Sequence, residues 1–358
     1  MKTEPHTLII LTPGFAKDEA DSTCLPAIQN FVSTVNSKFA AVKIIILAFD
    51  YPFFTSQYQW KNNRVVSFNG YRKQYLKKLI KWITIWTKLN QLKRENNITG
   101  ILSFWCGECA WIGNRYAKRH QLKHYCWIQG QDAKKENRYV KLVKPSASEM
   151  IALSDLIQKE FFKNHGILPQ HIIPLGIDAT EFREPGASRD IDILGAGSLI
   201  PLKRYDIFIE VVYGLKEYFP QIKAVLCGKG TEEANLKKLV EKYGVQKNIL
   251  LTDELPHAEM LHQMKRAKLL LHTSSYEGLG VVCIEALAAG ATVVSFCKPM
   301  NADIMHWYIV NDKEAMIKKA IEILNDPAPR YVSVIPFTMQ DTAKKIMQLY
   351  GYNEAASV

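Results

Sequence analysis

The fold of this chain is decided by the stretch His272-Thr-Ser-Ser-Tyr-Glu277-Gly278-Leu279-Gly280-Val-Val-Cys-Ile-Glu285-Ala-Leu-Ala-Ala-Gly290-Ala-Thr-Val-Val-Ser295. It predicts the end of an apolar strand, a loop with two glycines, and a helix of small residues that begins near Leu279 or Gly280 and ends at Gly290. The start of such a helix presents unpaired N–H groups and the positive end of its dipole, and glycines let the backbone approach a ligand closely. We therefore expect an anion to bind at this helix start.

Two carboxylates accompany that helix. Glu277 precedes it, and Glu285 lies in its second turn. Carboxylates form bidentate hydrogen bonds to neighbouring hydroxyl groups, a geometry that suits sugars and riboses better than phosphates. The pair can therefore bracket a ligand whose phosphates rest on the helix start.

Outward from this stretch, apolar strand-like runs alternate with helical stretches, which is typical of parallel sheets covered by helices on both faces. Charged residues, Pro185 and Gly186 interrupt the pattern near 177–189. We therefore expect an α/β protein with two Rossmann-like doubly wound domains facing each other across a cleft, at 1–180 and 188–334, and a C-terminal helix within 335–358 that packs back on the first domain. Strands are expected at 8–11, 42–49, 101–104, 124–128, 191–196, 224–227, 249–251, 269–272 and 292–296, and helices at 25–39, 71–94, 110–119, 204–217, 232–243, 282–289 and 337–350.

Composition narrows the class of protein. The chain has 358 residues, 47% of them hydrophobic, which is enough for a sizeable core and about two domains. No apolar run approaches the roughly 18 residues of a membrane span, and the first apolar run is too short for a secretory signal. The seven cysteines are odd in number and irregularly spaced, so we expect no disulfide framework and a cytoplasmic protein.

The chain is basic, with 46 Lys and Arg against 35 Asp and Glu, a formal net charge of +11. This charge indicates an acidic partner, which could be nucleic acid, anionic lipid or a phosphorylated small molecule. A nucleic-acid binder is the weakest of these hypotheses, because no helix-turn-helix, zinc finger or aromatic RNA-binding signature is present.

Further motifs follow one another through the second half of the chain. They are Ile173-Pro-Leu-Gly176-Ile-Asp178, Gly195-Ala-Gly197-Ser198-Leu-Ile-Pro-Leu-Lys203, Leu226-Cys-Gly228-Lys-Gly230 and Leu251-Thr-Asp-Glu-Leu255-Pro. Together with Glu277 and Glu285, which seven residues separate, they resemble the retaining GT-B glycosyltransferases of family four, the glycosyl transferases group 1. The resemblance covers the C-terminal domain almost end to end and the N-terminal domain more loosely.

The resemblance implies roles for individual residues on the donor side. Glu285 would hold the ribose hydroxyls, Glu277 would contact the donor sugar, and Lys203 would act with it in catalysis by neutralising the diphosphate. The remaining donor-binding candidates are Gly14, Ser198, Arg204, Leu255, Gly278, Leu279 and Gly280, of which Leu255 would take the nucleobase and Gly14, in the loop Pro13-Gly14-Phe15, would close over the phosphates. The family likeness further implies a nucleoside-diphosphate sugar as donor, UDP before GDP, and no metal or other cofactor.

Three departures from the family pattern bear on activity. Ser198 stands where the family often has Arg, so Lys203, with Arg204, must supply the positive charge. Gln129 stands where the family commonly has a His beside the reacting carbon, and Gln cannot act as acid or base. The segment 298–311 is shorter than expected and lacks the usual Gly-rich turn. On the acceptor side the candidates are Glu108, Gln129 and Asp132.

Two motifs have a structural and a functional interpretation. Cys106-Gly-Glu-Cys109 could chelate zinc or cycle as a dithiol, but no second such pair accompanies it, so a turn before a helix is the alternative. The helix expected at 71–94 has Lys77, Lys81, Thr84 and Lys88 along one stripe and Tyr75, Leu79, Trp82, Ile83 and Trp86 roughly opposite. It is either an ordinary domain helix or a basic, aromatic-flanked surface for anionic lipid. His272 we interpret as structural.

The function expected from these observations is transfer of a hexose or N-acetylhexosamine from a nucleotide sugar to a glycan or lipid-linked glycan, in polysaccharide biosynthesis and with peripheral contact at the inner membrane face. The alternative is a non-catalytic GT-B partner subunit that binds nucleotide or glycan, which Ser198 and Gln129 motivate.

Overall fold

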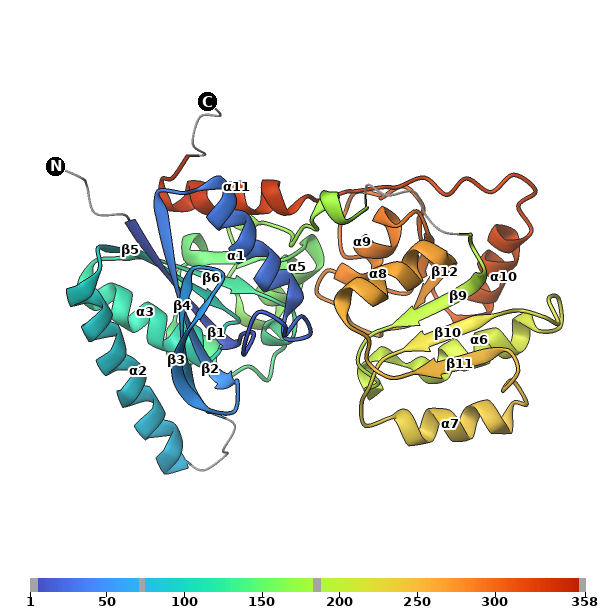
Figure 1. The fold of residues 1–358 in the computed structure, drawn as a ribbon, viewed down its shortest axis with the longest axis horizontal. Helices are drawn as coiled ribbons and strands as arrows, with labels where there is room; N and C mark the ends of the chain where they lie inside the picture. Colours follow the sequence, from blue (N-terminus) through green and yellow to red (C-terminus); the bar gives the residue numbers. More distant parts are fainter. Residues whose placement is uncertain (1–5, 71–74, 183–187, 354–358) are drawn as a thin grey trace. The chain divides into compact units, whose positions relative to one another are not determined.

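The computed structural model describes residues 6–70, 75–182 and 188–353, without the side chains of residues 75–77 (Figure 1). The chain divides into two compact units. Unit 1 contains residues 1–176 and 339–358, and unit 2 contains residues 177–338. The sequence placed the boundaries at 180, 188 and 334, so the observed division lies a few residues away. The expected C-terminal helix forms as α11 (Met339–Tyr350) and belongs to unit 1.

Unit 2 is built on a six-stranded sheet in which every neighbouring pair of strands is parallel. The strand order is β11-β10-β9-β12-β13-β14. Counted within the unit, this is 3-2-1-4-5-6, the order of a Rossmann sheet. The elements are β9 (Ile191–Ala196), α6 (Tyr205–Leu215), β10 (Ala224–Cys227), α7 (Glu233–Lys242), β11 (Ile249–Thr252), α8 (His257–Arg266), β12 (Ala267–His272), α9 (Val281–Ala288), β13 (Thr292–Ser295), β14 (Trp307–Ile309) and α10 (Lys313–Leu324).

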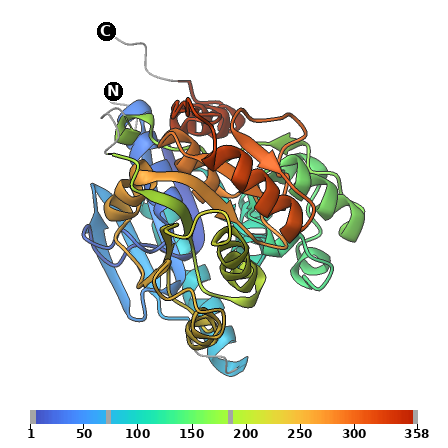
Figure 2. The ribbon, with the colours of Figure 1, turned by 90° about the vertical axis from the view of Figure 1, so that its right-hand side faces the viewer.

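Helices cover both faces of this sheet, as the view in Figure 2 shows. α10 and α7 both contact α6, and these three helices share one apolar core with the sheet, while α8 packs against α9. The order of the strands reverses direction between β9 and β12. Ligands of such sheets bind at the carboxyl ends of the strands beside this switch point.

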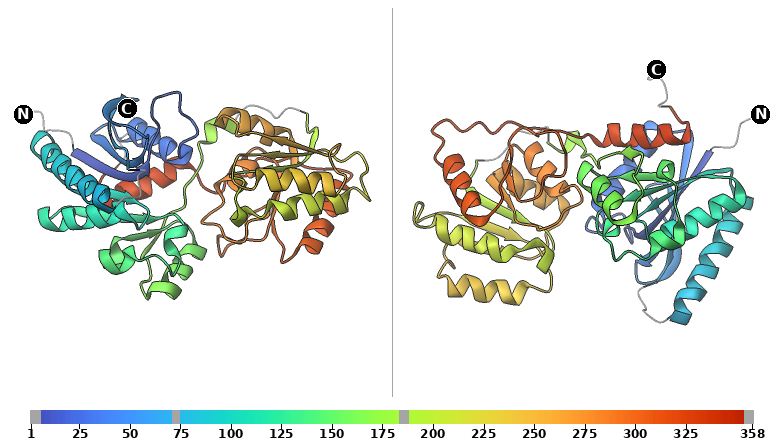
Figure 3. Two further views of the ribbon diagram at one scale, coloured as in Figure 1. Left: turned by 90° about the horizontal axis from the view of Figure 1, so that it is seen from below. Right: turned by 180° about the vertical axis from the view of Figure 1, so that it is seen from behind.

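Unit 1 has an eight-stranded sheet with the order β3-β4-β2-β1-β5-β6-β7-β8. All pairs except β3 with β4 are parallel, and the switch point lies between β1 and β5. α11 lies beside α1 (Figure 3). The Tyr350 hydroxyl of α11 donates to the carbonyl of Ile101 in β5. The elements are β1 (His6–Gly14), α1 (Pro26–Lys38), β2 (Val42–Tyr51), β3 (Thr55–Trp60), β4 (Asn63–Phe68), α2 (Tyr75–Glu95), β5 (Ile98–Phe104), α3 (Glu108–His120), β6 (Lys123–Ile128), α4 (Tyr139–Val143), β7 (Met150–Ala152), α5 (Asp155–His165) and β8 (His171–Ile172).

The hairpin β3–β4 was not expected from the sequence. Its turn consists of Lys61 and Asn62, both with positive φ, at 41° and 65°. Two such residues match the type I′ turn that closes two-residue hairpins. β3 is mostly exposed at the edge of the sheet, so it lacks the apolar run that reveals the other strands.

The prediction of which side of α2 is buried was partly wrong. Its fully buried residues are Ile85, Leu89 and Leu92, which pack into the core of unit 1. Leu79 and Ile83, expected on the buried side, are 37% and 67% exposed. Lys81, expected on the wet side, is nearly buried because Asp50 and Glu108 pair with its ammonium group. No helix in the described part of the chain is both long and apolar enough to cross a bilayer.

Candidate active site

The loops that follow β9 and β12 meet at the switch point of unit 2. The Thr273 hydroxyl donates to the carbonyl of Lys203 over 2.8 Å, and the N–H of Ser275 donates to the carbonyl of Leu202 over 3.1 Å. These bonds hold the segment Pro201–Lys203 against the loop that carries Glu277. The family-like motifs of both strands therefore come together in three dimensions.

Glycines are required where the loops after β9 and β10 touch. Gly228 has φ +152°, and a Cβ at this position would lie 2.0 Å from the carbonyl oxygen of Gly197. A Cβ at Gly230 would lie 2.3 Å from the carbonyl oxygen of Leu199. Backbone bonds join the same loops, from the N–H of Gly197 to Cys227 and from that of Leu199 to Lys229. The two glycine motifs are thus explained by close backbone packing at the carboxyl edge of the sheet.

Lys203, Glu277 and His272 form a charged cluster at this edge. Lys203 Nζ lies 2.5 Å from Glu277 Oε2, and His272 Nε2 lies 3.2 Å from the same oxygen. Burial raises the pKa of Glu277, but the hydrogen bond from His272 and the charge of Lys203 outweigh it and lower the pKa to about 2. Glu277 is therefore ionised at neutral pH, and His272 fixes its position, in line with the structural role expected for this histidine.

The ammonium group of Lys203 has unused hydrogen-bond donors. An ammonium group carries three N–H donors, and Glu277 is the one hydrogen-bond partner of Lys203 Nζ among the described residues. Its side chain is 18% exposed. A phosphate can therefore share this lysine with Glu277.

The helix expected after the Gly-rich loop forms as α9. Gly280 precedes it with φ +74°, a left-handed conformation that favours glycine, and Leu279 is buried. The first N–H groups of a helix have no intrahelical partner and lie at the positive end of the helix dipole. Gly278–Gly280 is buried, and the N–H of Gly278 donates to Glu277 Oε1 over 3.3 Å, so the donors for a ligand here are those of the half-buried Val281 and Val282 in the first turn of α9.

Glu285 has a partner that the sequence did not reveal. His257, the first residue of α8, places Nε2 2.9 Å from Glu285 Oε1 and Nδ1 4.0 Å from Glu181 Oε1. The hydrogen bond to Glu285 raises the pKa of His257, against the lowering effect of burial. No motif marks His257; the only signal is its position two residues after Leu255, at the start of the helix that packs against α9.

The other donor-side candidates lie in loops at this edge. Ser198 is exposed in the loop after β9, and Arg204 is exposed in the left-handed residue that precedes α6. Leu255 is half-buried between β11 and α8. All three lie at the carboxyl side of the parallel strands, as the motif order predicts.

In unit 1, the loop expected after Leu11 is instead strand. β1 continues to Gly14 because this residue still pairs with Tyr51 of β2. Gly14 is buried, and a Cβ there would lie 3.3 Å from the Cβ of Tyr51. Phe15 is fully buried with its ring against Trp60. The stretch Pro13-Gly14-Phe15 is therefore packed into unit 1 and forms no free loop.

Glu108 begins α3 at the switch point of unit 1, and its carboxylate is fully occupied. It pairs with Lys78 over 2.5 Å and Lys81 over 2.9 Å, and it accepts from the indole of Trp82 and the hydroxyl of Tyr139. Burial raises the pKa of Glu108, but the hydrogen bonds from both lysines outweigh it and lower the pKa.

Asp132 joins the loops after β5 and β6. Its carboxylate accepts the N–H groups of Cys106 at 2.7 Å, Gly130 at 2.8 Å and Gln129 at 3.0 Å, and it is buried. Gln129 is half-buried, and its side-chain amide donates to the carbonyl of Trp127. Among the three acceptor-side candidates, Gln129 keeps the most unoccupied polar atoms.

Cys106 and Cys109 are both buried, and burial raises the pKa of the Cys109 thiol. Within the described ranges, no three His, Cys, Asp or Glu side chains form a group able to hold a metal ion. The pair instead flanks the turn into α3, as the structural interpretation predicts.

The fold as a whole is that of GT-B glycosyltransferases. Sucrose-phosphate synthase from Thermosynechococcus elongatus matches 96% of this chain and 98% of its own with a TM-score of 0.74 at 15% identity. The structure of Anabaena Alr3699/HepE in complex with UDP and glucose matches 96% of this chain and 97% of its own, with a TM-score of 0.65 at 14% identity.

The family match lies within unit 2. Residues 178–336 match the family described as glycosyl transferases group 1. The phosphatidylinositol N-acetylglucosaminyltransferase gpi3 subunit of Schizosaccharomyces pombe is 26% identical over 164 residues, which are 44% of this chain. The match spans only 36% of the length of that relative. The expected fold is confirmed, and unit 2 matches the expected family.

Proposed function

We propose that this chain is a retaining glycosyltransferase that moves a hexose or N-acetylhexosamine from a UDP-sugar to a glycan or lipid-linked glycan acceptor. The observation that carries the proposal is the Lys203–Glu277 pair at the switch point of a sheet with Rossmann order. The UDP in the similar HepE structure and the N-acetylglucosaminyltransferase name of the gpi3 relative support the choice of donor.

On this proposal, the donor lies across the carboxyl edge of unit 2. The spare donors of Lys203, with Arg204 nearby in sequence, bind the diphosphate, and the start of α9 adds the backbone N–H groups of its first turn. Glu285, held by His257, accepts the ribose hydroxyls. Leu255 offers an apolar contact for the base, and Glu277 accepts hydroxyls of the sugar.

The transfer step needs no side chain that acts as a base. The bond between the anomeric carbon and the diphosphate oxygen breaks, and the acceptor oxygen bonds to the anomeric carbon on the same face, so that configuration is retained. The proton of the acceptor hydroxyl passes to the leaving phosphate oxygen. Lys203 stabilises the charge that develops on that leaving group, which compensates for Gln129 where a histidine is common.

Unit 1 would receive the acceptor. Because Glu108 and Asp132 are engaged by neighbouring groups, the proposal gives them the role of holding the loops after β5 and β6, and leaves Gln129 to contact the acceptor. With a net charge of +11, the protein would work as a peripheral protein at an anionic membrane surface.

A nucleotide screen tests the donor site. Thermal-shift and calorimetric titrations with UDP, GDP, ADP and their sugar conjugates are run with magnesium and with EDTA. We expect stabilisation by UDP and UDP-sugars that EDTA does not change. Glu285→Ala should weaken nucleotide binding by about 1–3 kcal/mol, since the ribose hydroxyls lose a charged acceptor. Glu259→Ala, which changes an exposed glutamate of α8, is the matched control.

Release of UDP from UDP-sugar separates catalysis from binding. Nucleotide binding without sugar transfer to any glycan or glycolipid would favour the non-catalytic partner subunit, which the exposed Ser198 and the amide of Gln129 motivate. Absence of binding by every nucleotide would contradict the transferase and leave the partner subunit, as a protein that binds glycan without a donor site.

A further inference from the structure

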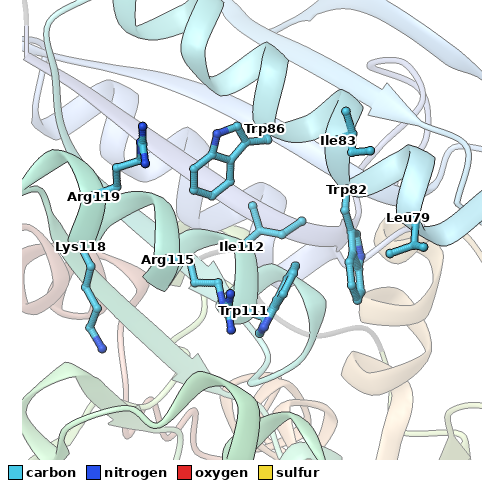
Figure 4. A pocket seen from close by; sticks show the side chains of 9 residues that line it. All are labelled: Leu79, Trp82, Ile83, Trp86, Trp111, Ile112, Arg115, Lys118 and Arg119. Atoms are coloured by element: carbon cyan, nitrogen blue, oxygen red, sulfur yellow. The ribbon is translucent and has the colours of Figure 1, made fainter.

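An open groove of about 530 Å³ runs between α2 and α3 in unit 1 (Figure 4). α2 contributes Leu79, Trp82, Ile83 and Trp86, and α3 contributes Trp111, Ile112, Arg115, Lys118 and Arg119. The groove is large enough for part of a small amphiphile. None of its residues belongs to the proposed donor site in unit 2.

Tryptophans form the floor of the groove. The rings of Trp82 and Trp111 lie 4.3 Å apart, and the guanidinium of Arg115 lies 4.6 Å from the Trp111 ring. Ile83 and the neighbouring Ile80 are 67% and 63% exposed, so the apolar surface continues from the groove onto the outer face of α2. A contiguous exposed apolar surface of this kind marks an interaction site.

The cations of the groove have no acidic partner among the described residues. Among the ion pairs of the described residues, none involves Arg115, Lys118 or Arg119, whereas Lys78 and Lys81 on the same helix pair are both bound by Glu108. Burial lowers the pKa of His120, and the neighbouring charges of Lys93 and Arg119 lower it further. In Figure 4, Lys118 and Arg119 lie at one end of the groove and point to opposite sides of it, Arg115 lies beside Trp111 nearer the middle, and Leu79, Trp82 and Ile83 lie at the other end.

From this polarity we infer that the groove binds an anionic membrane lipid, with an acyl chain along the tryptophans and the phosphate on Arg115, Lys118 and Arg119. A lipid fits better than an acidic peptide, because tryptophan rings and basic side chains beside exposed aliphatic residues are the composition of helices that lie in the membrane interface. Anionic headgroups attract such basic residues at the membrane surface.

The lipid would anchor the protein and would not be the sugar acceptor. The apolar end of the groove adjoins Glu108, since the Trp82 indole donates to its carboxylate. Arg119 lies eleven residues further along α3, about 16 Å at a rise of 1.5 Å per residue. The headgroup would thus lie away from the carboxyl edge of the sheet of unit 1. The inference deepens the proposed function by naming its membrane partner, and its test requires no transfer.

The test measures binding of the full chain to vesicles by flotation. Vesicles of phosphatidylcholine alone are compared with vesicles containing phosphatidylglycerol, some of it brominated on the acyl chain. We expect binding only to the anionic vesicles, weaker in high salt, with tryptophan fluorescence quenched by the brominated lipid. Arg115→Ala/Lys118→Ala/Arg119→Ala should lower the affinity roughly a hundredfold. Leu79→Ser/Ile83→Ser should lower it about tenfold and reduce quenching.

Two controls match these variants. Lys17→Ala/Lys38→Ala/Lys163→Ala removes three exposed cations elsewhere in unit 1, and Leu142→Ser/Phe162→Ser removes two apolar side chains that are each 52% exposed. Both should bind like the unaltered protein.

An equal loss of vesicle binding in the charge control would mean that the protein adsorbs by net charge alone. Unchanged quenching in Leu79→Ser/Ile83→Ser would mean that no chain enters the groove, and a dimer that this variant dissociates would assign the surface to a second copy. Each of these results would overturn the inference. Unchanged thermal unfolding and nucleotide binding show that a variant is folded.

Discussion

Unit 1 and unit 2 each place a lysine–glutamate cluster at the switch point of a sheet, but among the described residues the lysine of unit 2 keeps more unused hydrogen-bond donors. In unit 1, Glu108 accepts from four side chains, and each of its lysines has a second partner, Tyr139 for Lys78 and Asp50 for Lys81. In unit 2, Lys203 has Glu277 as its partner and keeps two donors. The same pair of residue types therefore stabilises the fold in one unit and can receive a ligand in the other.

This difference follows from where the partners originate. Lys78, Lys81 and Trp82 all lie on α2, so one helix closes over Glu108. Lys203 and Glu277 lie on separate loops after β9 and β12, and although they are 18% and 22% exposed against 19% for Glu108, Lys203 Nζ has no second partner among the described residues. Loops positioned by a rigid sheet are the usual carriers of function.

The largest effect should come from opening the pair in unit 2. Lys203→Ala should lower the rate of sugar transfer about 100- to 1000-fold, because the leaving diphosphate loses its cation in the transition state. UDP release measures the rate. Lys223→Ala, an exposed lysine that precedes β10 and so lies at the opposite edge of the sheet, should leave it unchanged. A Lys203→Ala rate within threefold of the unaltered protein would make the unit 2 cluster as structural as that of unit 1.

Much of unit 2 was predictable, because its chemistry follows short motifs in chain order. The strands β9 to β13 and the helix α9 form where the apolar runs and glycines indicate, and the structure brings Lys203 and Glu277 together. His257 was not predictable, since its bond to Glu285 depends on how α8 packs against α9. No local pattern encodes that packing.

Fewer structural features of unit 1 were predictable from the sequence. Periodicity located α2 but assigned Lys81 to the wet face, because the ion pairs that draw it inward come from β2 and α3. The polar edge strand β3 and the continuation of β1 to Gly14 were likewise not predicted. Their structure depends on pairing with distant strands and not on their own composition.

A smaller effect should follow from breaking the closed cluster of unit 1. Glu108→Gln should lower the free energy of unfolding by about 2 kcal/mol, because it leaves the nearly buried Lys81 with Asp50 as its one acidic partner within the described ranges. The loss is no larger because solvent at the partly exposed cluster screens the charge of Lys81. Hydrogen exchange of peptides from α2 and α3 in the full chain measures it. Transfer at low temperature should change less than threefold.

Glu136→Gln, which alters an exposed glutamate of the same unit, is the control for this variant. If Glu108→Gln instead abolished transfer and left exchange unchanged, Glu108 would contact the acceptor, and the two clusters would be functionally alike.

The smallest effect should come from His257, which tests how firmly unit 2 holds its ribose-side carboxylate. The pKa of His257 is raised above 6.5 in the folded protein, so its contribution to stability is complete below pH 6.5 and is lost as the pH rises through the folded-state value. The groups that face it are Glu285 of α9 and Glu181. His257→Gln should therefore destabilise unit 2 by about 1 kcal/mol at pH 6 and less at pH 9. Thermal unfolding at both pH values, with and without UDP, measures this difference.

His262→Gln, on the same helix, is the matched control for the loss of an imidazole. A loss for His257→Gln that is equal at both pH values would mean that the imidazole acts by packing alone, and that Glu285 owes its position to the helix and not to charge.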